Sequence, residues 1–320
     1  MLRESPMDLG VRLYGASDAV TSVLREADAL DRDLAFDAEL DVSEIATTAH
    51  VLGALQRGED APQGALVRRV SGGALVRVGP GTLHVLLALR TPSALVPCDA
   101  RSLNNRYVRP LLRALTKSGA PAHYFGRDWV SVGHRPAGAV GFAHDAGTGR
   151  AAFEAFVPVR TSFSDPRPSF LGKEPGTLEG ISGRAFDTKT LTELIADAYG
   201  ALAVGASRVL SPRAVVTTPE TAEALRGEPR WAARVDEVIG PVCAGRDSAG
   251  VLRLGGDFMA SRDAVARVEA EVAALGDGAT SEAVGAIVDL AFAPPAAIEG
   301  VKDLGSLRRA LLAALFQNRT

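Results

Sequence analysis

The segment Arg68-Arg69-Val70-Ser71-Gly72-Gly73 places two cations before a run of small residues. Neighbouring residues of a strand point to opposite faces, so one arginine can enter a pocket while the other contacts the scaffold. The Ser-Gly-Gly run lets the backbone approach a ligand closely, because glycine has no side chain. Amide groups beside a guanidinium suit a phosphate or a carboxylate. The segment therefore predicts an anion-binding loop, with a bend in a surface strand as the alternative.

The sequence around this segment has the pattern of a sheet. Residues 64–78 and 82–90 read as strands, and Gly79-Pro80-Gly81 between them is a turn signal. Short glycine-containing turns separate three more strand-like runs, which are 123–132, 137–144 and 150–159. Short strands joined in this way are typical of an antiparallel meander. Residues 160–180, rich in Pro, Gly and Ser, are expected to form an ordered loop.

Other segments of the chain have helical patterns. The first fifty residues are predicted to be mainly helical, because apolar residues recur at helical spacing from Val20 to Leu30, and Ser43 is a candidate start of a further short helix. Residues 103–118 suit a helix that ends at Gly119. Because Pro110 interrupts this pattern, the helix is expected to begin late, near Val108. A further helix is predicted over 191–202.

The last third of the chain reads as a small α/β unit. Residues 251–254 suit a strand, and the stretches 265–275 and 304–315 have helical spacing of apolar residues. A boundary near Ser211-Pro212 divides the chain into domains 1–210 and 211–320.

Composition limits the class of protein. The 320 residues are 47% hydrophobic, enough for a full core. A net charge of −3 and a pI of about 6.0 provide no basic field for nucleic acid. Two cysteines make no disulfide framework, and no apolar run is long enough to span a membrane. The start of the chain lacks the apolar stretch of a signal peptide, so a cytoplasmic protein is expected.

In this setting the Arg68–Gly73 segment resembles the Arg-Arg-x-Ser-Gly-Gly-Gly element of the lipoate–protein ligases. Other elements of that family are matched in the same order, from about residue 50 onward. These matches are Leu52-Gly53-Ala54-Leu55-Gln56, Asn104-Asn105, Gly126-Arg127-Asp128-Trp129, Arg135-Pro136-Ala137-Gly138-Ala139-Val140 and Gly256-Asp257-Phe258. The chain thus resembles a diverged member of the biotin/lipoate protein ligase superfamily.

The resemblance implies an α+β fold, with a mixed, largely antiparallel sheet flanked by helices and a small α/β accessory domain at the C-terminus. It implies that ATP and magnesium activate lipoate, or another short- or medium-chain acid, as an acyl-adenylate. A lysine of a lipoyl carrier domain, or of an H-protein-like acceptor, would then take the acyl group. No nucleic acid or membrane partner is expected.

The resemblance also supplies site residues. Arg135 stands where the family has its catalytic lysine, and Asp128 is a weak magnesium candidate. The residues expected to bind the substrate or the adenylate are Arg68, Arg69, Ser71, Gly72, Gly73, Ala74, Arg77, Asp128, Gly138 and Ala139.

Four departures from the family pattern fall on ligand-facing positions. Ala74 replaces a third glycine, and Arg77-Val78-Gly79 replaces a Tyr-His-Asp run. Arg135 replaces lysine, and it stays protonated but is bulkier and planar. Glu154-Ala155 replaces His-Gly, and a carboxylate at this position would repel an adenylate.

Several functions therefore stay open. They are conventional lipoate ligation, an altered acyl or adenylate chemistry, and a non-catalytic pseudo-ligase that binds a ligand or partner. An octanoyl or lipoyl transferase would need a reactive cysteine, and Cys98 is a weak candidate because Asp99 beside it raises a thiol pKa. The five histidines show no zinc-ligand spacing, and His134 is the one beside the expected pocket.

Overall fold

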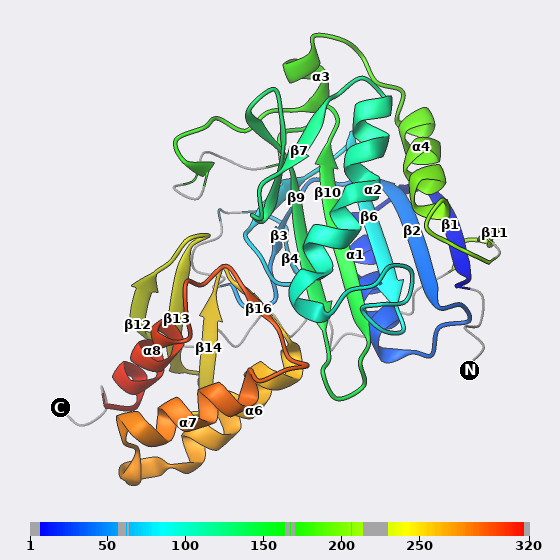
Figure 1. Cartoon of the computed structure of the whole chain (residues 1–320). Helices are drawn as coiled ribbons and strands as arrows, with labels where there is room; N and C mark the ends of the chain where they lie inside the picture. Colours follow the sequence, from blue (N-terminus) through cyan, green and yellow to red (C-terminus); the bar gives the residue numbers. More distant parts are fainter. Residues whose placement is uncertain are drawn as a thin grey trace.

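The computed structural model describes residues 7–56, 62, 64–163, 167, 170–205, 207–213 and 230–316 (Figure 1). An eight-stranded sheet with the order β11-β1-β2-β6-β10-β9-β8-β7 forms the larger unit. The β11, β1 and β2 strands are parallel, and the other neighbours are antiparallel. The bounds are β1 Leu9–Ser17, β2 Ala38–Ile45, β6 Thr82–Leu89, β7 Ala122–Tyr124, β8 Trp129–Val132, β9 Arg135–His144, β10 Ala151–Pro158 and β11 Ser207–Val209.

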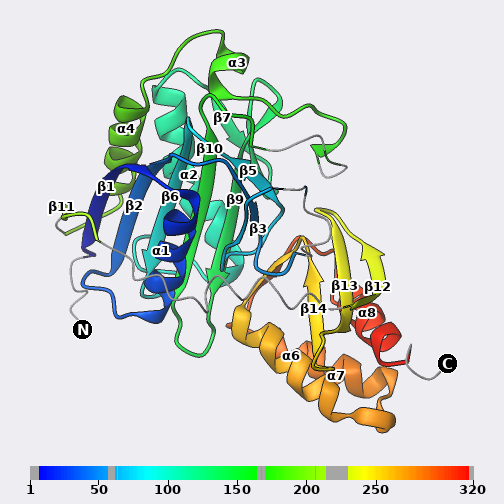
Figure 2. The ribbon, with the colours of Figure 1, turned by 180° about the vertical axis from the view of Figure 1, so that it is seen from behind.

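Helices cover both faces of this sheet. One face carries α1 (Ala19–Asp31), and the opposite face carries α2 (Leu103–Lys117) and α4 (Thr188–Gly200), as the two views show (Figures 1 and 2). The short helix α3 (Leu178–Ser182) and the 3-10 turn Ala100–Ser102 lie in connections. This arrangement confirms the predicted α+β class, with a mixed, mostly antiparallel sheet flanked by helices.

A second, three-stranded sheet holds the arginine–glycine segment. Its order is β4-β3-β5, with β3 at Ala49–Leu52, β4 at Leu66–Arg68 and β5 at Val76–Val78. The predicted continuous strand over 64–78 is therefore wrong, because residues 69–75 leave the ladder as a loop. Ser71, Gly72 and Gly73 supply this break, since small residues tolerate the bend, and Gly73 has a φ of +102°.

The C-terminal unit pairs a small sheet with helices. Its antiparallel sheet has the order β12-β13-β14, with bounds β12 Arg230–Asp236, β13 Pro241–Arg246 and β14 Leu252–Gly256. The remaining elements are β15 Met259–Ala260, α6 Arg262–Ala274, the turn Gly276–Gly278, α7 Ser281–Ala291, β16 Ile298–Glu299 and α8 Gly305–Phe316. The boundary near Ser211-Pro212 stays a prediction, because it adjoins residues 214–229, which lie outside the described residues.

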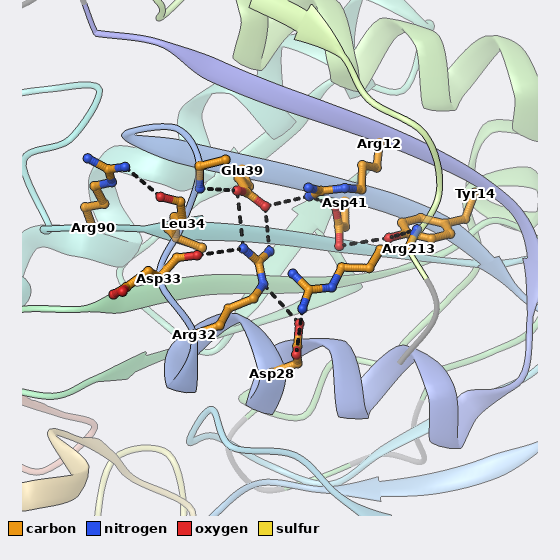
Figure 3. Close-up of polar contacts among 11 residues, drawn as sticks. Arg12, Tyr14, Asp28, Arg32, Asp33, Leu34, Glu39, Asp41, Arg90 and Arg213 are labelled. Atoms are coloured by element: carbon orange, nitrogen blue, oxygen red, sulfur yellow. Dashed lines mark hydrogen bonds and ion pairs between the residues drawn. The ribbon is translucent and has the colours of Figure 1, made fainter. Parts of the chain in front are cut away.

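The N-terminal region corrects the prediction of a mainly helical start. Within residues 7–50, the described part of this region, only α1 is helical, and Ser43 lies within β2 rather than at a helix start. The acidic residues of β2 are stabilised in the strand by arginines: Glu39 accepts hydrogen bonds from Arg12 at 2.6 Å and from Arg32 at 2.5 Å (Figure 3). Burial opposes ionisation of Glu39, but these hydrogen bonds outweigh it and hold its pKa at about 2.

Helix α2 corrects a second prediction, because it begins at Leu103 and contains Pro110. A proline inside a helix costs about 3 kcal/mol. Tyr107, Leu111 and Leu115 are all buried against the sheet, and burial of three such side chains offsets that cost. Gly119 follows the helix with a φ of +88°, as the C-terminal signal predicted.

The central strands follow the predicted meander, with one difference. The run 123–132 forms two strands, β7 and β8, because Gly126 has a φ of +70° and turns the chain between them. The runs 137–144 and 150–159 correspond to β9 and β10.

Candidate functional site

The loop between β4 and β5 lies against β9 and the C-terminal unit. The Gly72 N–H donates to the Phe142 carbonyl at 3.0 Å, and the Gly73 N–H donates to the Phe258 carbonyl at 3.4 Å. A Cβ on Gly72 would lie 2.6 Å from the Met259 Cα. The loop is therefore packed closely on both sides, and side chains at its glycines would not fit without a backbone shift.

Arg69 sits at the centre of a buried polar cluster. Its guanidinium Nη1 contacts the Glu154 Oε2 at 2.9 Å, and both side chains are fully buried. The Arg69 Nη2 donates to the Ala74 carbonyl at 3.1 Å. Arg69 is thus held by an internal carboxylate and by its own loop.

Two further side chains complete the partners of Glu154. The Ser71 hydroxyl donates to Oε2 at 2.5 Å, and His84 Nε2 lies 2.7 Å from Oε1. The His84 ring stacks on Phe156 with centroids 4.9 Å apart. Burial opposes ionisation of Glu154, but the charge of Arg69 and the hydrogen bond from His84 outweigh it and lower its pKa to about 2.

A second buried carboxyl approaches the loop from α1. Glu26 Oε2 accepts the Val70 N–H at 2.8 Å, and the nearby Ser71 N–H acts with it to lower the pKa of this carboxyl. Burial and the charge of Glu154 raise the pKa of Glu26 to about 8. Among the described residues, Glu26 Oε1 and Arg69 Nε have no hydrogen-bond partner.

Arg68 faces away from this cluster and contacts the scaffold. Its Nη1 donates to the carbonyls of Gly53 at 3.2 Å, Ala54 at 3.3 Å and Gln56 at 2.5 Å. Gln56 in turn donates to Asp257 Oδ1 at 2.7 Å. The Leu52–Gln56 and Gly256–Phe258 elements, far apart in sequence, therefore meet beside the loop.

Arg135 lies apart from Arg69. Its exposed guanidinium donates to the carbonyls of Glu174 at 3.1 Å and Pro175 at 2.9 Å. Glu154 pairs with Gly141 on β9, six positions from Arg135, which corresponds to about 20 Å along a strand. The structure does not bring Arg135 and Glu154 together. A ligand bound at Arg135 would therefore lie too far from Glu154 for the expected repulsion to act at close range.

The other predicted residues are distributed around the sheet. Arg77 is exposed on β5, and Asp128 is buried and pairs with Arg167 at 3.2 Å. Gly138 and Ala139 are buried within β9. Of the predicted set, Arg69, Ser71, Gly72, Gly73 and Ala74 lie together in one loop, and the roles assigned to all of the predicted residues stay predictions.

Cys98 has the environment of an unreactive thiol. It is half-buried, and its Sγ donates to the Pro92 carbonyl at 2.8 Å. Burial, together with the charge of Asp99, raises the pKa of the thiol to about 11. A nucleophilic thiolate therefore requires a different environment from the one this residue has.

Neither a metal cluster nor a membrane helix appears in the described part of the chain. There, no group of three or more His, Cys, Asp or Glu side chains is arranged to hold a metal ion, and no helix has the length and apolar character needed to cross a membrane. A cavity of about 350 Å³ opens between β1 and α4, beside Leu13 and Thr188, and none of its lining residues belongs to the Arg69 site.

Solved structures with the same architecture are those of lipoate ligases. LipL1 of P. falciparum, in complex with lipoate, has a TM-score of 0.62 at 10% identity, covering 97% of this chain and 100% of its own. The chain has the fold of the lipoate–protein ligases. A bi-partite lipoate protein ligase of Thermoplasma acidophilum, studied with its E2 lipoyl domain, has a TM-score of 0.53 at 14% identity, covering 68% of this chain and 90% of its own.

A third structure with the lipoate-ligase fold is a lipoate-protein ligase A bound with ATP. Its TM-score is 0.50 at 12% identity, and the match covers 68% of this chain and 92% of its own. No model of a known protein family matches the sequence, and no curated protein matches it. The expected resemblance is thus confirmed as a shared fold.

Sequence reasoning missed Glu26 and His84 as members of the cluster, and it did not pair Glu154 with Arg69. Glu26 is hidden in an ordinary amphipathic helix, where nothing in the pattern marks its burial. His84 and Glu154 carried a usable signal, because each is the one polar residue among apolar neighbours of a strand, Leu83-His84-Val85 and Phe153-Glu154-Ala155. Two such residues on neighbouring strands favour a buried pair.

Proposed function

We propose that this protein is a lipoate–protein-ligase-like enzyme that activates lipoate or a related acid with ATP and magnesium and transfers the acyl group to a lysine of a carrier domain. The observation that carries the proposal is the match over nearly the whole chain to a ligase fold whose solved form holds lipoate. The ATP-bound and E2-associated relatives support the nucleotide and the acceptor.

The Arg69 loop is the part of this chain best suited to the anionic intermediate. It combines a guanidinium with backbone N–H groups of small residues, a set of donors that binds phosphate and carboxylate. For Arg69 to reach a ligand, its guanidinium must exchange Glu154 for the ligand's anion. The Gly73 N–H must likewise leave the Phe258 carbonyl.

A second candidate function is a non-catalytic pseudo-ligase that binds a ligand or partner. The specific observation in its favour is the Arg69–Glu154 pair, because an internal carboxylate already satisfies the cation. Removing that carboxylate from a buried arginine costs several kcal/mol, and a ligand must supply this energy.

One assay separates the two functions. The full chain is incubated with ATP, magnesium and, in turn, lipoate, octanoate and biotin, and pyrophosphate release is followed. Release with one acid that is lost in Arg69→Gln, but kept in the exposed α2 control Arg109→Gln, supports the ligase. Absence of release with every acid, together with thermal stabilisation by lipoate alone, supports the pseudo-ligase.

A further inference from the structure

Two buried carboxyl groups hold the same short segment. Glu154 on β10 contacts Arg69 and Ser71, and Glu26 on α1 accepts the Val70 N–H at 2.8 Å. Glu26 and Glu154 are both completely buried. The position of the loop is therefore fixed by one helix and one strand that lie far apart in sequence.

The two carboxyl groups differ in their partners. Glu154 has a guanidinium, a hydroxyl and a histidine ring, whereas the described partners of Glu26 are backbone N–H groups. One oxygen of Glu26 has no partner among the described residues. A buried carboxylate without a cation is unfavourable, so the neutral acid is the form that this environment favours.

The charged groups with the largest effect on Glu26 are Glu154 and Arg69, and these two are paired with each other. Glu154 faces Glu26 from β10, and Arg69 faces it from the loop after β4. His84 on β6 is bonded to Glu154.

We propose that Glu26 is a positioning residue whose protonated carboxyl holds the Val70–Ser71 backbone, and so places the Arg69 guanidinium for the anionic ligand. The identity of the ligand in this inference rests on the proposed function. The hold of Glu26 on the loop rests on the contacts described above. When Glu26 loses its proton to solvent, a second negative charge appears beside Glu154. The two carboxylates then repel each other and compete for Arg69.

The consequence is a binding site that weakens in mild alkali. Because burial and Glu154 raise the pKa of Glu26 to about 8, lipoate affinity of the full chain is expected to fall as pH rises through this value. Glu26→Gln keeps a neutral side chain with an acceptor for Val70, so its affinity at pH 7 should match the wild type within about twofold and stay constant to pH 9. Glu26→Ala removes the acceptor, and its affinity should fall about tenfold at all pH values.

The test combines binding with two measurements that need no ligand. Lipoate titrations are run from pH 6 to pH 9 on wild type, Glu26→Gln, Glu26→Ala and the exposed control Glu193→Gln. Glu299, whose pKa burial raises to about 7, adds a protonated-carboxyl band of its own. Infrared difference spectra at pH 7 against the wild type should therefore show the loss of one protonated-carboxyl band in Glu26→Gln and no loss in the control. Hydrogen exchange of the Val70 and Ser71 amides should be faster in Glu26→Ala and restored to the wild-type rate in Glu26→Gln.

The outcomes separate the two proposals. If lipoate does not bind at any pH, the proposed function fails, and the infrared and exchange measurements still decide the role of Glu26. If the difference spectrum of Glu26→Gln against the wild type shows no loss of a protonated-carboxyl band, or if the two variants exchange alike, the positioning role is overturned. An alkaline loss of affinity that persists in Glu26→Gln overturns it as well.

Discussion

At the scale of single residues, the site is defined by how one arginine is neutralised. Arg69 and Glu154 are each completely buried, and Ser71 and His84 occupy the remaining positions around the carboxylate. A buried ion pair is favourable only when its hydrogen bonds are satisfied, and this one is nearly complete. The pair therefore contributes to a unique loop conformation as well as to the chemistry proposed for Arg69.

Removal of the carboxylate should be strongly destabilising. Glu154→Ala leaves Arg69 buried and unpaired, so the free energy of unfolding, measured by urea denaturation, should fall by about 3–5 kcal/mol. The double variant Arg69→Met with Glu154→Leu replaces both charges by apolar groups and should recover most of that loss. An equally large loss in the double variant would show that packing, and not charge, dominates at this position.

The acid side of the stability profile should depend on Glu154. Its pKa in the folded protein is about 2, below the ordinary value of 4.5, so its contribution is complete above pH 4.5 and is lost as pH falls toward 2. In Glu154→Gln, the difference in thermal midpoint between pH 6 and pH 3 should shrink. The difference should not vanish, because the pKa of Glu39 is also lowered to about 2.

Cys98 should be dispensable. Because its thiol has a pKa of about 11, alkylation of the native protein at pH 7.5 should be much slower than that of a free thiol. Cys98→Ser should leave pyrophosphate release and lipoate binding unchanged. Mass spectrometry after incubation with an octanoyl carrier should detect no acyl-thioester on this residue, and a stable adduct there would favour a transferase instead.

At the scale of elements, the glycine loop shows what sequence can and cannot predict. The Ser71–Gly73 run marked a break and a close backbone approach, and both are present, since a Cβ on Gly72 would meet the Met259 backbone. The identity of the partner could not be read from the sequence, because Met259 is nearly two hundred residues away. The same limit applies to Glu26, whose burial is decided by where α1 packs.

Two element predictions failed because tertiary contacts outweighed local preference. Acidic residues are poor strand formers, yet Glu39 lies in β2 because Arg12 and Arg32 neutralise it. Pro110 disfavours a helix, yet α2 continues through it because its apolar face is buried against the sheet. The strands β6, β9 and β10 could be predicted, because the apolar residues and the flanking turn glycines both indicate strands in these segments.

The close packing of the loop yields a direct test. Gly72→Ala places a methyl group against the Met259 Cα at 2.6 Å, and overpacking of this kind typically costs about 1–3 kcal/mol. Gly15→Ala is the matched control, because a Cβ there meets no atom within 4 Å. Equal stability of the two variants in chemical denaturation would contradict the packing shown here.

At the scale of the whole molecule, the two units share a core. Ile239, Met259 and Ala297 of the C-terminal part belong to the main hydrophobic cluster under the large sheet. Ser261 of the C-terminal unit contacts His144 of the large unit at 2.8 Å, and its hydroxyl also accepts the Ala297 N–H of its own unit at 2.8 Å. These buried contacts predict that the units unfold together.

The two tryptophans make this cooperativity measurable. Trp129 lies in the large unit and Trp231 in the C-terminal unit, so the variants Trp129→Phe and Trp231→Phe each leave one fluorescent reporter. Both reporters should give the same urea midpoint in the full chain. Met259→Ala should lower both midpoints together, and a shift confined to the Trp231 signal would contradict the shared core.

The contact between Gly72 and Met259 also constrains the evolutionary history of the molecule. Since the two backbones touch, a larger residue at position 72 is tolerable only if the chain near 259 retreats. Homologous sequences should therefore show correlated exchange at these two positions, with glycine retained wherever the second unit is present. In homologues that lack the C-terminal unit, residues larger than glycine should occur at position 72.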